Sequence, residues 1–240
     1  MANMTAQTLG DIVSADYRTA AVLERFGLDF CCGGRATLDE ACDRRGLDLP
    51  AVMKALEDVS TTAPDHAAPT AEWPLDRLMN HIVSRHHSYV RGALPVLLTH
   101  TRKIADVHGE RNPNLPRVAQ YFAALADELT QHMAREEQIL FPYIHSLVAA
   151  DREDRKLGTS PFGTVQNPVR MMEADHQQAG DTMKLIRELT DDFTAPGFAC
   201  TTYRVCLDEL RDFERDLHLH IHLENNILHP GALALETRLT

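Results

Sequence analysis

The chain has 240 residues, of which 44% are hydrophobic and 25% charged, so it holds enough apolar material for one or two folded domains and wholesale disorder is excluded. Its formal net charge of −11 argues against nucleic acid as a partner, because an acidic surface repels a phosphate backbone. No apolar run approaches the roughly 18 residues of a membrane span. Residues 1–9 show neither the basic nor the apolar segment of a signal peptide.

The cysteine and histidine contents indicate a compartment and a chemistry. Five cysteines are an odd number, which argues against a secreted disulfide scaffold and favours a reduced, cytoplasmic protein. The 13 histidines are more than half as numerous as the 24 lysines and arginines together. Because histidine is the commonest metal ligand, a metal site is a natural hypothesis, although most of the histidines are expected to be ordinary surface or structural residues.

The first 60 residues predict a small helical domain. Thr8 is placed to cap a first helix, and a second helix over residues 19–26 ends at Gly27, a good helix terminator. A capping box opens a third helix over residues 37–46, and a fourth follows over residues 50–59.

The rest of the chain predicts a four-helix bundle. Residues 61–72 are rich in Thr, Ala and Pro without apolar periodicity, which is typical of a linker. Apolar residues then recur at helical spacing in four long segments, at about 74–108, 114–149, 168–191 and 202–228. Residues 217–223 alternate as in a strand, but the longer pattern around them favours a helix. We therefore expect an all-α protein with a small domain over residues 1–60 and an antiparallel bundle over residues 73–240.

An internal repeat carries the chemistry of the bundle. Residues 132–142 and 220–230 align without gaps, 88 residues apart, and both read H-x-x-x-E-x-x-I-L-x-P. His132 with Glu136, and His220 with Glu224, lie four residues apart and therefore share a helix face.

Helical spacing places these faces inside the bundle. His220 shares its stripe with Cys206, Leu210, Phe213 and Leu217, and His132 shares its stripe with Leu125, Leu129, Ile139 and Tyr143. His218 and His222 are rotated about 200° from His220 and are expected to face water. A glutamate on an apolar stripe is costly unless it is paired or binds a metal, and two such pairs favour a metal.

Each half of the repeat has a partner helix that carries another histidine. His176 lies 44 residues before His220, and His87 lies 45 residues before His132. His86 fits the apolar periodicity nearly as well as His87, so the spacing leaves both open.

Four histidines and two glutamates from four helices suit a pair of iron or manganese ions bridged by the carboxylates. Six protein ligands leave coordination positions for solvent, an oxo bridge or a small gas. Gly180, one turn after His176, offers no further ligand. Glu128 and Asp175 lie close enough to support the ligands from outside, although a solvated surface role is an equal alternative for each.

The small domain contains an adjacent pair of cysteines, Cys31 and Cys32, followed by two glycines. Adjacent cysteines cannot bind one zinc in the usual C-x-x-C manner, and no second pair completes a site. We expect both thiols on an open, flexible turn, suited to redox chemistry or transient metal binding. Buried, inert thiols are the alternative, and Cys42, Cys200 and Cys206 are expected in the core.

Residues 29–34, Asp-Phe-Cys-Cys-Gly-Gly, resemble the signature of the N-terminal domain of bacterial iron–sulfur cluster repair proteins, also called regulators of cell morphogenesis and nitric oxide signalling. From residue 73 to about 232 the chain resembles their hemerythrin-like domain, with matching motifs at 85–87, 132–137, 173–176 and 220–226. The resemblance implies two non-haem irons with an oxo bridge and carboxylate bridges from Glu136 and Glu224. It implies histidine ligands at His87 rather than His86, and at His132, His176 and His220.

The resemblance also implies a role in stress response: repair of iron–sulfur clusters damaged by nitric oxide or oxidants, through the supply of iron. The partners would be apo or damaged iron–sulfur proteins and small gases such as NO and O2, with Cys31 and Cys32 as candidate thiols for iron transfer. Gly180 stands where oxygen-carrying hemerythrins usually place a second histidine, which argues against simple oxygen transport. The alternatives are a di-iron enzyme that reduces nitric oxide and a protein that only binds it.

Overall fold

A computed structural model describes residues 4–60, 70–156, 160 and 162–240. The chain forms two compact units, each built from segments that are far apart in sequence. The first contains residues up to 79 together with 147–160 and 218–240, and the second contains residues 80–146 and 161–217.

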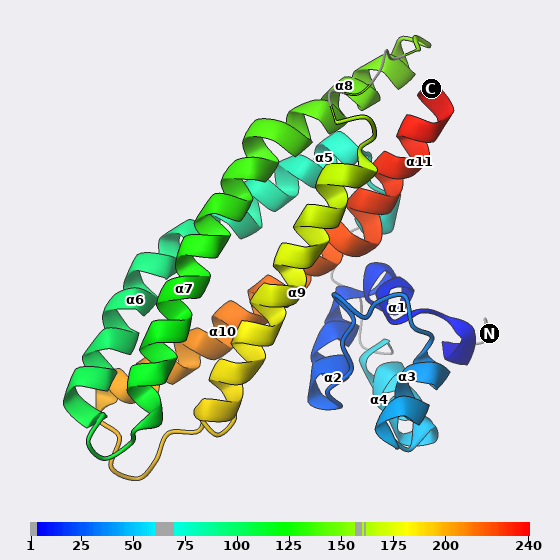
Figure 1. The fold of residues 1–240 in the computed structure, drawn as a ribbon. Coiled ribbons are helices and arrows are strands. Elements are labelled where there is room, and N and C mark those ends of the chain that lie inside the picture. Colours follow the sequence, from blue (N-terminus) through cyan, green and yellow to red (C-terminus); the bar gives the residue numbers. More distant parts are fainter. Residues whose placement is uncertain (1–3, 61–69, 157–159, 161) are drawn as a thin grey trace. The chain divides into compact units, whose positions relative to one another are not determined.

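The second unit is a bundle of long helices. Figure 1 shows α6 (Ser88–His108), α7 (Asn114–Arg135), α9 (Gln166–Leu189) and the first part of α10 (Thr201–Leu223), with α7 between α6 and α9. The π-helical turn η4 (Ile82–His87) leads into α6, and η5 (Glu136–Leu140) leads from α7 into α8 (Phe141–Arg152). Most residues of the predicted apolar stripes are buried, among them Leu94 of α6, Leu125 of α7 and Met172 of α9.

The core of the bundle is closely packed around aromatic rings. Phe122 of α7 and Phe213 of α10 are fully buried, with ring centroids 5.6 Å apart in an edge-to-face arrangement. The predicted α10 stripe, Cys206 through Leu217, is buried throughout. Each such side chain contributes roughly 1.5–3 kcal/mol by leaving water, so the interior that surrounds the bundle histidines is apolar.

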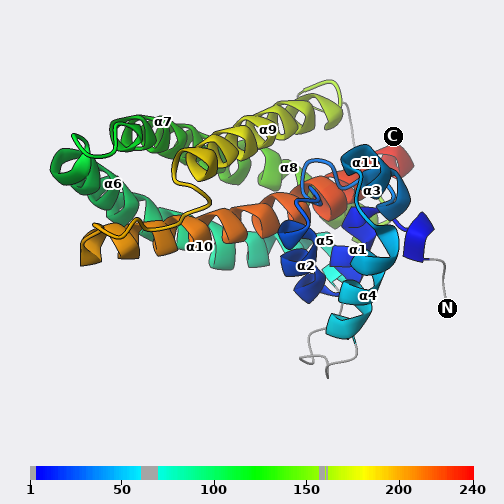
Figure 2. The ribbon, with the colours of Figure 1, turned by 90° about the horizontal axis from the view of Figure 1, so that it is seen from below.

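The first unit contains the small N-terminal domain and the C-terminal helices. The domain comprises η1 (Met4–Ala6), α1 (Leu9–Ala15), η2 (Tyr17–Thr19), α2 (Ala20–Arg25), α3 (Leu38–Arg45) and α4 (Leu49–Ser60). The other elements of the unit are η3 (Thr70–Glu72), most of α5 (Leu75–His81), the end of α8, the end of α10, the π-helical turn η6 (Glu224–Leu228) and α11 (His229–Leu239). Figure 2 shows α1 to α4 clustered together.

The sequence signals of the N-terminal domain act as expected. The Thr8 side chain caps α1, and Thr37 with Glu40 forms a complete capping box at the start of α3. Gly27 and Gly46 end their helices with positive φ angles of 67° and 64°, which glycine adopts without strain.

The two π-helical turns η5 and η6 explain how both copies of the repeat continue past a proline. Phe141 and His229 donate their backbone N–H to the carbonyls of Glu136 and Glu224, five residues earlier. Pro142 and Pro230 come next, and a proline ring would otherwise collide with the carbonyl four residues before it. Widening the turn avoids that collision.

Each π turn inserts a residue and thereby rotates the helix that follows. The prediction that Ile139 lies on the inward stripe is wrong: Ile139 is 47% exposed, and Leu140 is buried in its place. The helix expected to end near residue 228 also continues, as α11, to Leu239.

The all-α prediction is confirmed. Among the described residues there is no strand, and an isolated β-bridge joins Thr8 to Thr37. Residues 217–223 are helical. The predicted linker lies outside the described residues except for 70–72, which form η3. In the part of the chain that the structure describes, no helix has the length and apolarity needed to span a membrane.

We expect Thr37→Ala to lower the free energy of unfolding by about 1 kcal/mol, because the N–H of Glu40 loses its side-chain acceptor. Urea denaturation followed by circular dichroism measures this as a lower midpoint at unchanged slope. Thr237→Ala is the matched control, since Thr237 is exposed within α11 and caps nothing. An equal effect in the two variants would contradict the capping role.

Candidate metal centre

Three histidines and one glutamate converge inside the bundle unit. Glu136 begins η5, and its Oε2 atom lies 3.3 Å from Nε2 of His87 in η4 and 3.3 Å from Nε2 of His132 in α7. Nε2 of His176 in α9 lies 3.0 Å from Nε2 of His132. Ligand atoms of His132, Glu136 and His176 all lie within 4.8 Å of one another, which is close enough to share an ion.

All four side chains are buried. His87 and Glu136 are 0% exposed, His132 1% and His176 2%. A carboxylate in such a place is costly unless a positive charge compensates it. Neutral imidazoles and a carboxylate together are the donor set that first-row ions such as iron accept, so these residues fit a metal by their chemistry.

Outer carboxylates orient two of the histidines. Nδ1 of His87 lies 2.6 Å from Glu137, and Nδ1 of His132 lies 3.3 Å from Asp175. When Nδ1–H donates to a carboxylate, the lone pair of Nε2 is left facing the centre, which is the arrangement of carboxylate–histidine–metal sites.

Arginines hold these outer carboxylates in turn. Arg91 donates to Glu137 at 2.6 Å, and Arg135 donates to Asp175 at 2.6 Å. Burial works to raise the pKa of Glu137, but the hydrogen bonds from His87 and Arg91 keep it below its usual value. The hydrogen bond from His132 and the charge of Arg135 lower the pKa of Asp175. Both carboxylates therefore stay charged and available to the histidines at neutral pH.

The other candidate histidine of η4 has a different neighbour. Nδ1 of His86 lies 3.2 Å from the Asp216 carboxylate of α10, and its ring packs against His81. The structure therefore brings His87, and not His86, next to Glu136.

A cavity of about 160 Å³ lies beside His132 and His176. Its lining includes Asp175, Arg135, Gln178 and Glu128. Glu128 is exposed and accepts a hydrogen bond from Gln178 at 2.6 Å. Glu128 and Gln178 therefore form part of the polar wall of this cavity.

The second copy of the repeat forms its own pair within the first unit. Nε2 of His220, near the end of α10, lies 3.0 Å from Oε1 of Glu224, the first residue of η6. His220 is 1% exposed and Glu224 0%. The two copies thus share the same local arrangement: an inward histidine followed by an inward glutamate at the start of a π-helical turn.

The cysteine loop is more ordered than the sequence predicts. Oδ1 of Asp29 accepts the backbone N–H groups of Cys31 at 3.1 Å and Cys32 at 2.9 Å. The expectation of two thiols on an open turn is wrong for Cys31, which is 6% exposed, whereas Cys32 is half-buried. The neighbouring Cys32 thiol and burial raise the pKa of the Cys31 thiol.

The glycines of the loop are required by close contacts. A Cβ atom at Gly33 would lie 2.8 Å from the Asp29 carbonyl oxygen. One at Gly34 would overlap both the Phe30 carbonyl oxygen and the side chain of Asn226 in η6.

The loop packs on the end of α10 and on η6. The amide of Asn226 donates to the carbonyl oxygens of Phe30 and Cys31, each at 3.1 Å, and Asn225 lies 3.4 Å from the Cys31 carbonyl. The Phe30 ring contacts His218 and His222 edge to face, with centroids 6.1 and 5.8 Å away.

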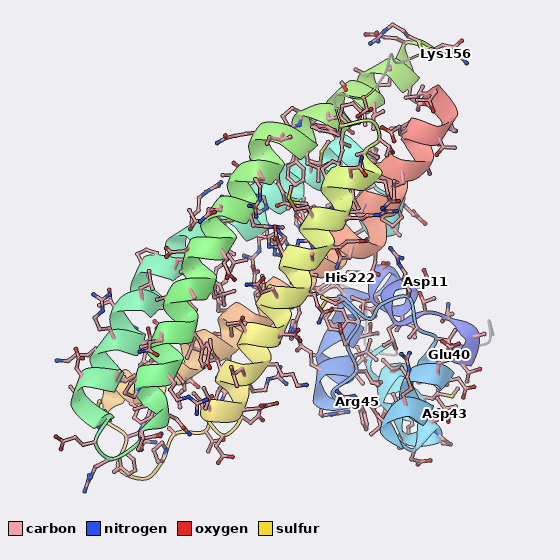
Figure 3. All side chains as sticks on the ribbon, viewed as in Figure 1. Asp11, Glu40, Asp43, Arg45, Lys156 and His222 are labelled. Carbon is pink, nitrogen blue, oxygen red and sulfur yellow. The ribbon has the colours of Figure 1, made fainter. Side chains whose placement is uncertain are left out.

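The expectation that His218 and His222 face water is therefore wrong. His222 is 1% exposed, its ring nitrogens lie 3.2 Å from Ser14 and from Asn226, and burial lowers its pKa to about 4. Figure 3 shows it close to Asp11 of α1. His218 is half-buried and lies 2.8 Å from Glu24. The reason is that the N-terminal domain covers this face of the helix.

The remaining three cysteines differ in their burial. Cys42 and Cys206 are buried as expected, and burial raises the pKa of Cys206 to about 12. The placement of Cys200 in the core is wrong, because it precedes α10 and is exposed, with its sulfur 3.2 Å from Nε2 of His108. Among the described residues, no atom of another element lies within 4 Å of the position that a Cβ atom would take at Gly180.

Sequence reasoning missed three side chains of these sites: Glu137, Asp29 and Asn226. Glu137 directly follows the inward Glu136, and helical periodicity turns it about 100° away, toward the surface. The available signal was the repeat itself, because its two copies differ directly after the shared glutamate: Glu-Gln in one and Asn-Asn in the other.

Comparison with known families defines the class of protein. Residues 5–60 match the family model ScdA_N, described as a domain of unknown function, and residues 78–232 match the model described as the hemerythrin HHE cation binding domain. The protein thus combines an ScdA_N domain with a hemerythrin-type bundle whose buried histidines and glutamates are able to hold a metal.

Comparison with individual proteins narrows the class further. Over 228 residues the chain is 38% identical to the iron-sulfur cluster repair protein YtfE of Yersinia pestis (strain Pestoides F), and equally to that of Yersinia pseudotuberculosis serotype IB (strain PB1/+). These alignments cover 95% of this chain and 96% of each relative. The chain therefore belongs to the family of the iron-sulfur cluster repair protein YtfE, which confirms the resemblance that its motifs show.

We expect Glu137→Gln and Asp175→Asn each to weaken Fe²⁺ binding by about 10- to 100-fold, because a histidine loses its charged orienting partner. Anaerobic competition against a ferrous chelator measures the change. Glu188→Gln, at an exposed position of α9, is the matched control and should bind as the parent does. Parental affinity in both outer-carboxylate variants would contradict the orienting role.

We expect Gly34→Ala to cost about 1–3 kcal/mol of unfolding free energy, because the added methyl group forces the loop away from Asn226. The Cys31 thiol should then react several-fold faster with a chromogenic disulfide reagent. Gly180→Ala is the control, since its methyl group meets open space and replaces a helical glycine. An unchanged thiol reaction rate in Gly34→Ala would show that the contact with Asn226 does not protect Cys31.

Proposed function

We propose that this protein binds two non-haem iron ions and supplies iron to iron–sulfur proteins whose clusters nitric oxide or oxidants have damaged. The observation that carries the proposal is the buried set of His87, His132, His176 and Glu136, with carboxylates outside two of its histidines. The printed function of the relatives, iron-sulfur cluster repair, supports the same role. We place this role in the cytoplasm, where the five cysteines stay reduced.

The proposed ligands are His87, His132, His176 and His220, with Glu136 and Glu224 as carboxylates shared by the two ions. Four imidazoles and two carboxylates supply a charge of −2 against the +4 of two ferrous ions. The bound ions would supply Lewis acidity and redox chemistry in an apolar interior.

The surroundings of the ligands suit the release of iron. Six protein side chains do not fill the coordination positions of two ions, so solvent or a chelating group can replace a ligand. Asp175 and Glu128 line the same cavity as His132 and His176, which supports a path for iron through this cavity. Both carboxylates attract a cation that leaves the histidines.

The test loads the protein anaerobically with ⁵⁷Fe and mixes it with a [4Fe–4S] hydro-lyase inactivated by nitric oxide. We expect about two irons per chain before mixing, and afterwards recovery of hydro-lyase activity together with ⁵⁷Fe in the rebuilt cluster. Glu136→Ala/Glu224→Ala should bind little iron and restore no activity. Glu110→Ala/Glu188→Ala, which removes two exposed glutamates, is the matched control and should behave as the parent does.

Other outcomes would support different functions. Many turnovers of nitric oxide to nitrous oxide with all ⁵⁷Fe retained would identify a nitric oxide reductase and contradict iron supply. Reversible binding of nitric oxide with neither product nor iron loss would identify a binding protein. Equal repair by the parent and by Glu136→Ala/Glu224→Ala would contradict any role of the metal ligands.

A further inference from the structure

The cysteine loop, residues 29–34, brings together potential metal ligands that are separate from those of the bundle. Asp29, Cys31 and Cys32 each offer a ligand atom, and these atoms all lie within 4.8 Å of one another. We propose that these three side chains form a second metal site, which binds one thiophilic divalent cation of the Fe²⁺ or Zn²⁺ type. The site goes beyond the function proposed above and does not depend on it.

The spacing of the ligand atoms is already close to that of a tetrahedral site. Two sulfurs bound at about 2.3 Å to one tetrahedral ion lie about 3.8 Å apart, and a sulfur and a carboxylate oxygen about 3.5 Å apart. The observed distances are 4.0 Å between the two Sγ atoms and 3.3 Å between Cys31 Sγ and Asp29 Oδ1. For these two pairs a shift of a few tenths of an ångström gives the tetrahedral spacing, and the Cys32 sulfur lies within 4.8 Å of a carboxylate oxygen of Asp29.

The loop also holds these ligands in place. The backbone N–H groups of Cys31 and Cys32 both donate to Oδ1 of Asp29, which fixes the carboxylate beside the thiols. Asn226 binds the carbonyl oxygens of Phe30 and Cys31 and anchors the backbone that carries the thiols. Ligands oriented in this way lose little freedom when an ion binds.

A disulfide between the two cysteines fits the loop less well than a shared ion. Adjacent Cα atoms lie about 3.8 Å apart, below the roughly 4.4 Å minimum for ordinary disulfides. The Sγ atoms lie 4.0 Å apart, and closing them to a bond of about 2.05 Å would strain the backbone. A bridging cation needs no such closure.

When the ion binds, it replaces the protons of the two thiols. The neighbouring Cys32 thiol and burial raise the pKa of the Cys31 thiol, so an arriving ion must displace the proton of that thiol. One M²⁺ ion, two thiols and one carboxylate give a complex of charge −1 and release two protons. No oxidant or reductant takes part.

The outer side of the site is open. Cys32 lines a shallow cleft of about 700 Å³ together with Gly33, Arg35, Glu40, Asp43 and Arg44. Figure 3 labels Glu40 and Asp43 on α3, beside this cleft. Three protein ligands leave a fourth position of a tetrahedral ion for water or for a donor from another molecule. An ion can therefore enter and leave without crossing the core of the domain.

The test titrates Co²⁺ into the full, iron-loaded chain, without oxygen and with a phosphine reductant in place of a thiol. We expect near-ultraviolet thiolate-to-cobalt absorption that saturates at one Co²⁺ per chain, with two protons released, and that Zn²⁺ removes by competition. Cys31→Ser and Cys32→Ser should each weaken binding at least tenfold. Asp29→Asn should do so as well, although an amide oxygen still accepts the two backbone N–H groups.

Two controls separate this site from the other thiols and from the bundle. Cys200→Ser removes the exposed cysteine outside the loop and should leave the cobalt signal unchanged. Glu136→Ala/Glu224→Ala should also keep the signal, so that failure of the bundle site and failure of this site are told apart.

The proposal is overturned if excess Co²⁺ produces no thiolate absorption in the parent, or if the signal disappears in Cys200→Ser and persists in Cys31→Ser. Circular dichroism checks that each variant is folded. Where a cysteine variant loses helicity, Asp29→Asn decides the question: parental affinity in that variant rejects the three-ligand site.

Discussion

The structure depends on a carboxylate that has been taken out of water. Glu136 is fully buried, and its Oε2 atom faces two imidazole nitrogens at 3.3 Å. A charge in such an interior is tolerated only when an opposite charge compensates it. The outer pairs Glu137–Arg91 and Asp175–Arg135 do not supply that charge, because their role is to turn the Nε2 lone pairs of the histidines inward. A cation is the group that completes this arrangement. The apolar stripes of α6, α7 and α9 pack around the carboxylate and its histidines, and the polar cavity beside His132 and His176 borders them.

The two copies of the repeat share one motif but have different neighbouring residues. Both copies place a histidine and a glutamate one turn apart and then widen into a π turn ahead of a proline. The next residues differ. In the first copy Glu137 supports His87, and in the second copy Asn225 and Asn226 bind the backbone of the cysteine loop. In the proposed metal site the shared positions are the ligands, and the divergent positions make the local contacts.

Most of the fold could be predicted because it follows from periodicity and local capping. The helix starts at Thr8 and Thr37, the ends at Gly27 and Gly46, and the burial of Phe213 and Leu217 need only nearby residues. The failures have a non-local cause or a change of register. Ile139 is exposed because a π turn shifts the helix by one residue, and His222 is buried because a domain some 200 residues earlier in the chain covers it. Helical periodicity alone predicts neither the shift in register at Ile139 nor the burial of His222 by a distant segment.

The difference between local sequence signals and contacts with distant residues also explains why the order of the cysteine loop was not predicted. Its composition, two thiols followed by two glycines, suggests exposure and flexibility when it is considered alone. In the structure each glycine is instead a place where another group comes too close for a side chain: the Asp29 carbonyl oxygen at Gly33, and Phe30 with Asn226 at Gly34. Asp29 then satisfies the backbone N–H groups that such a tight turn exposes. The glycines therefore make the loop rigid, and that rigidity sets the distance between the Asp29 carboxylate and the two thiols.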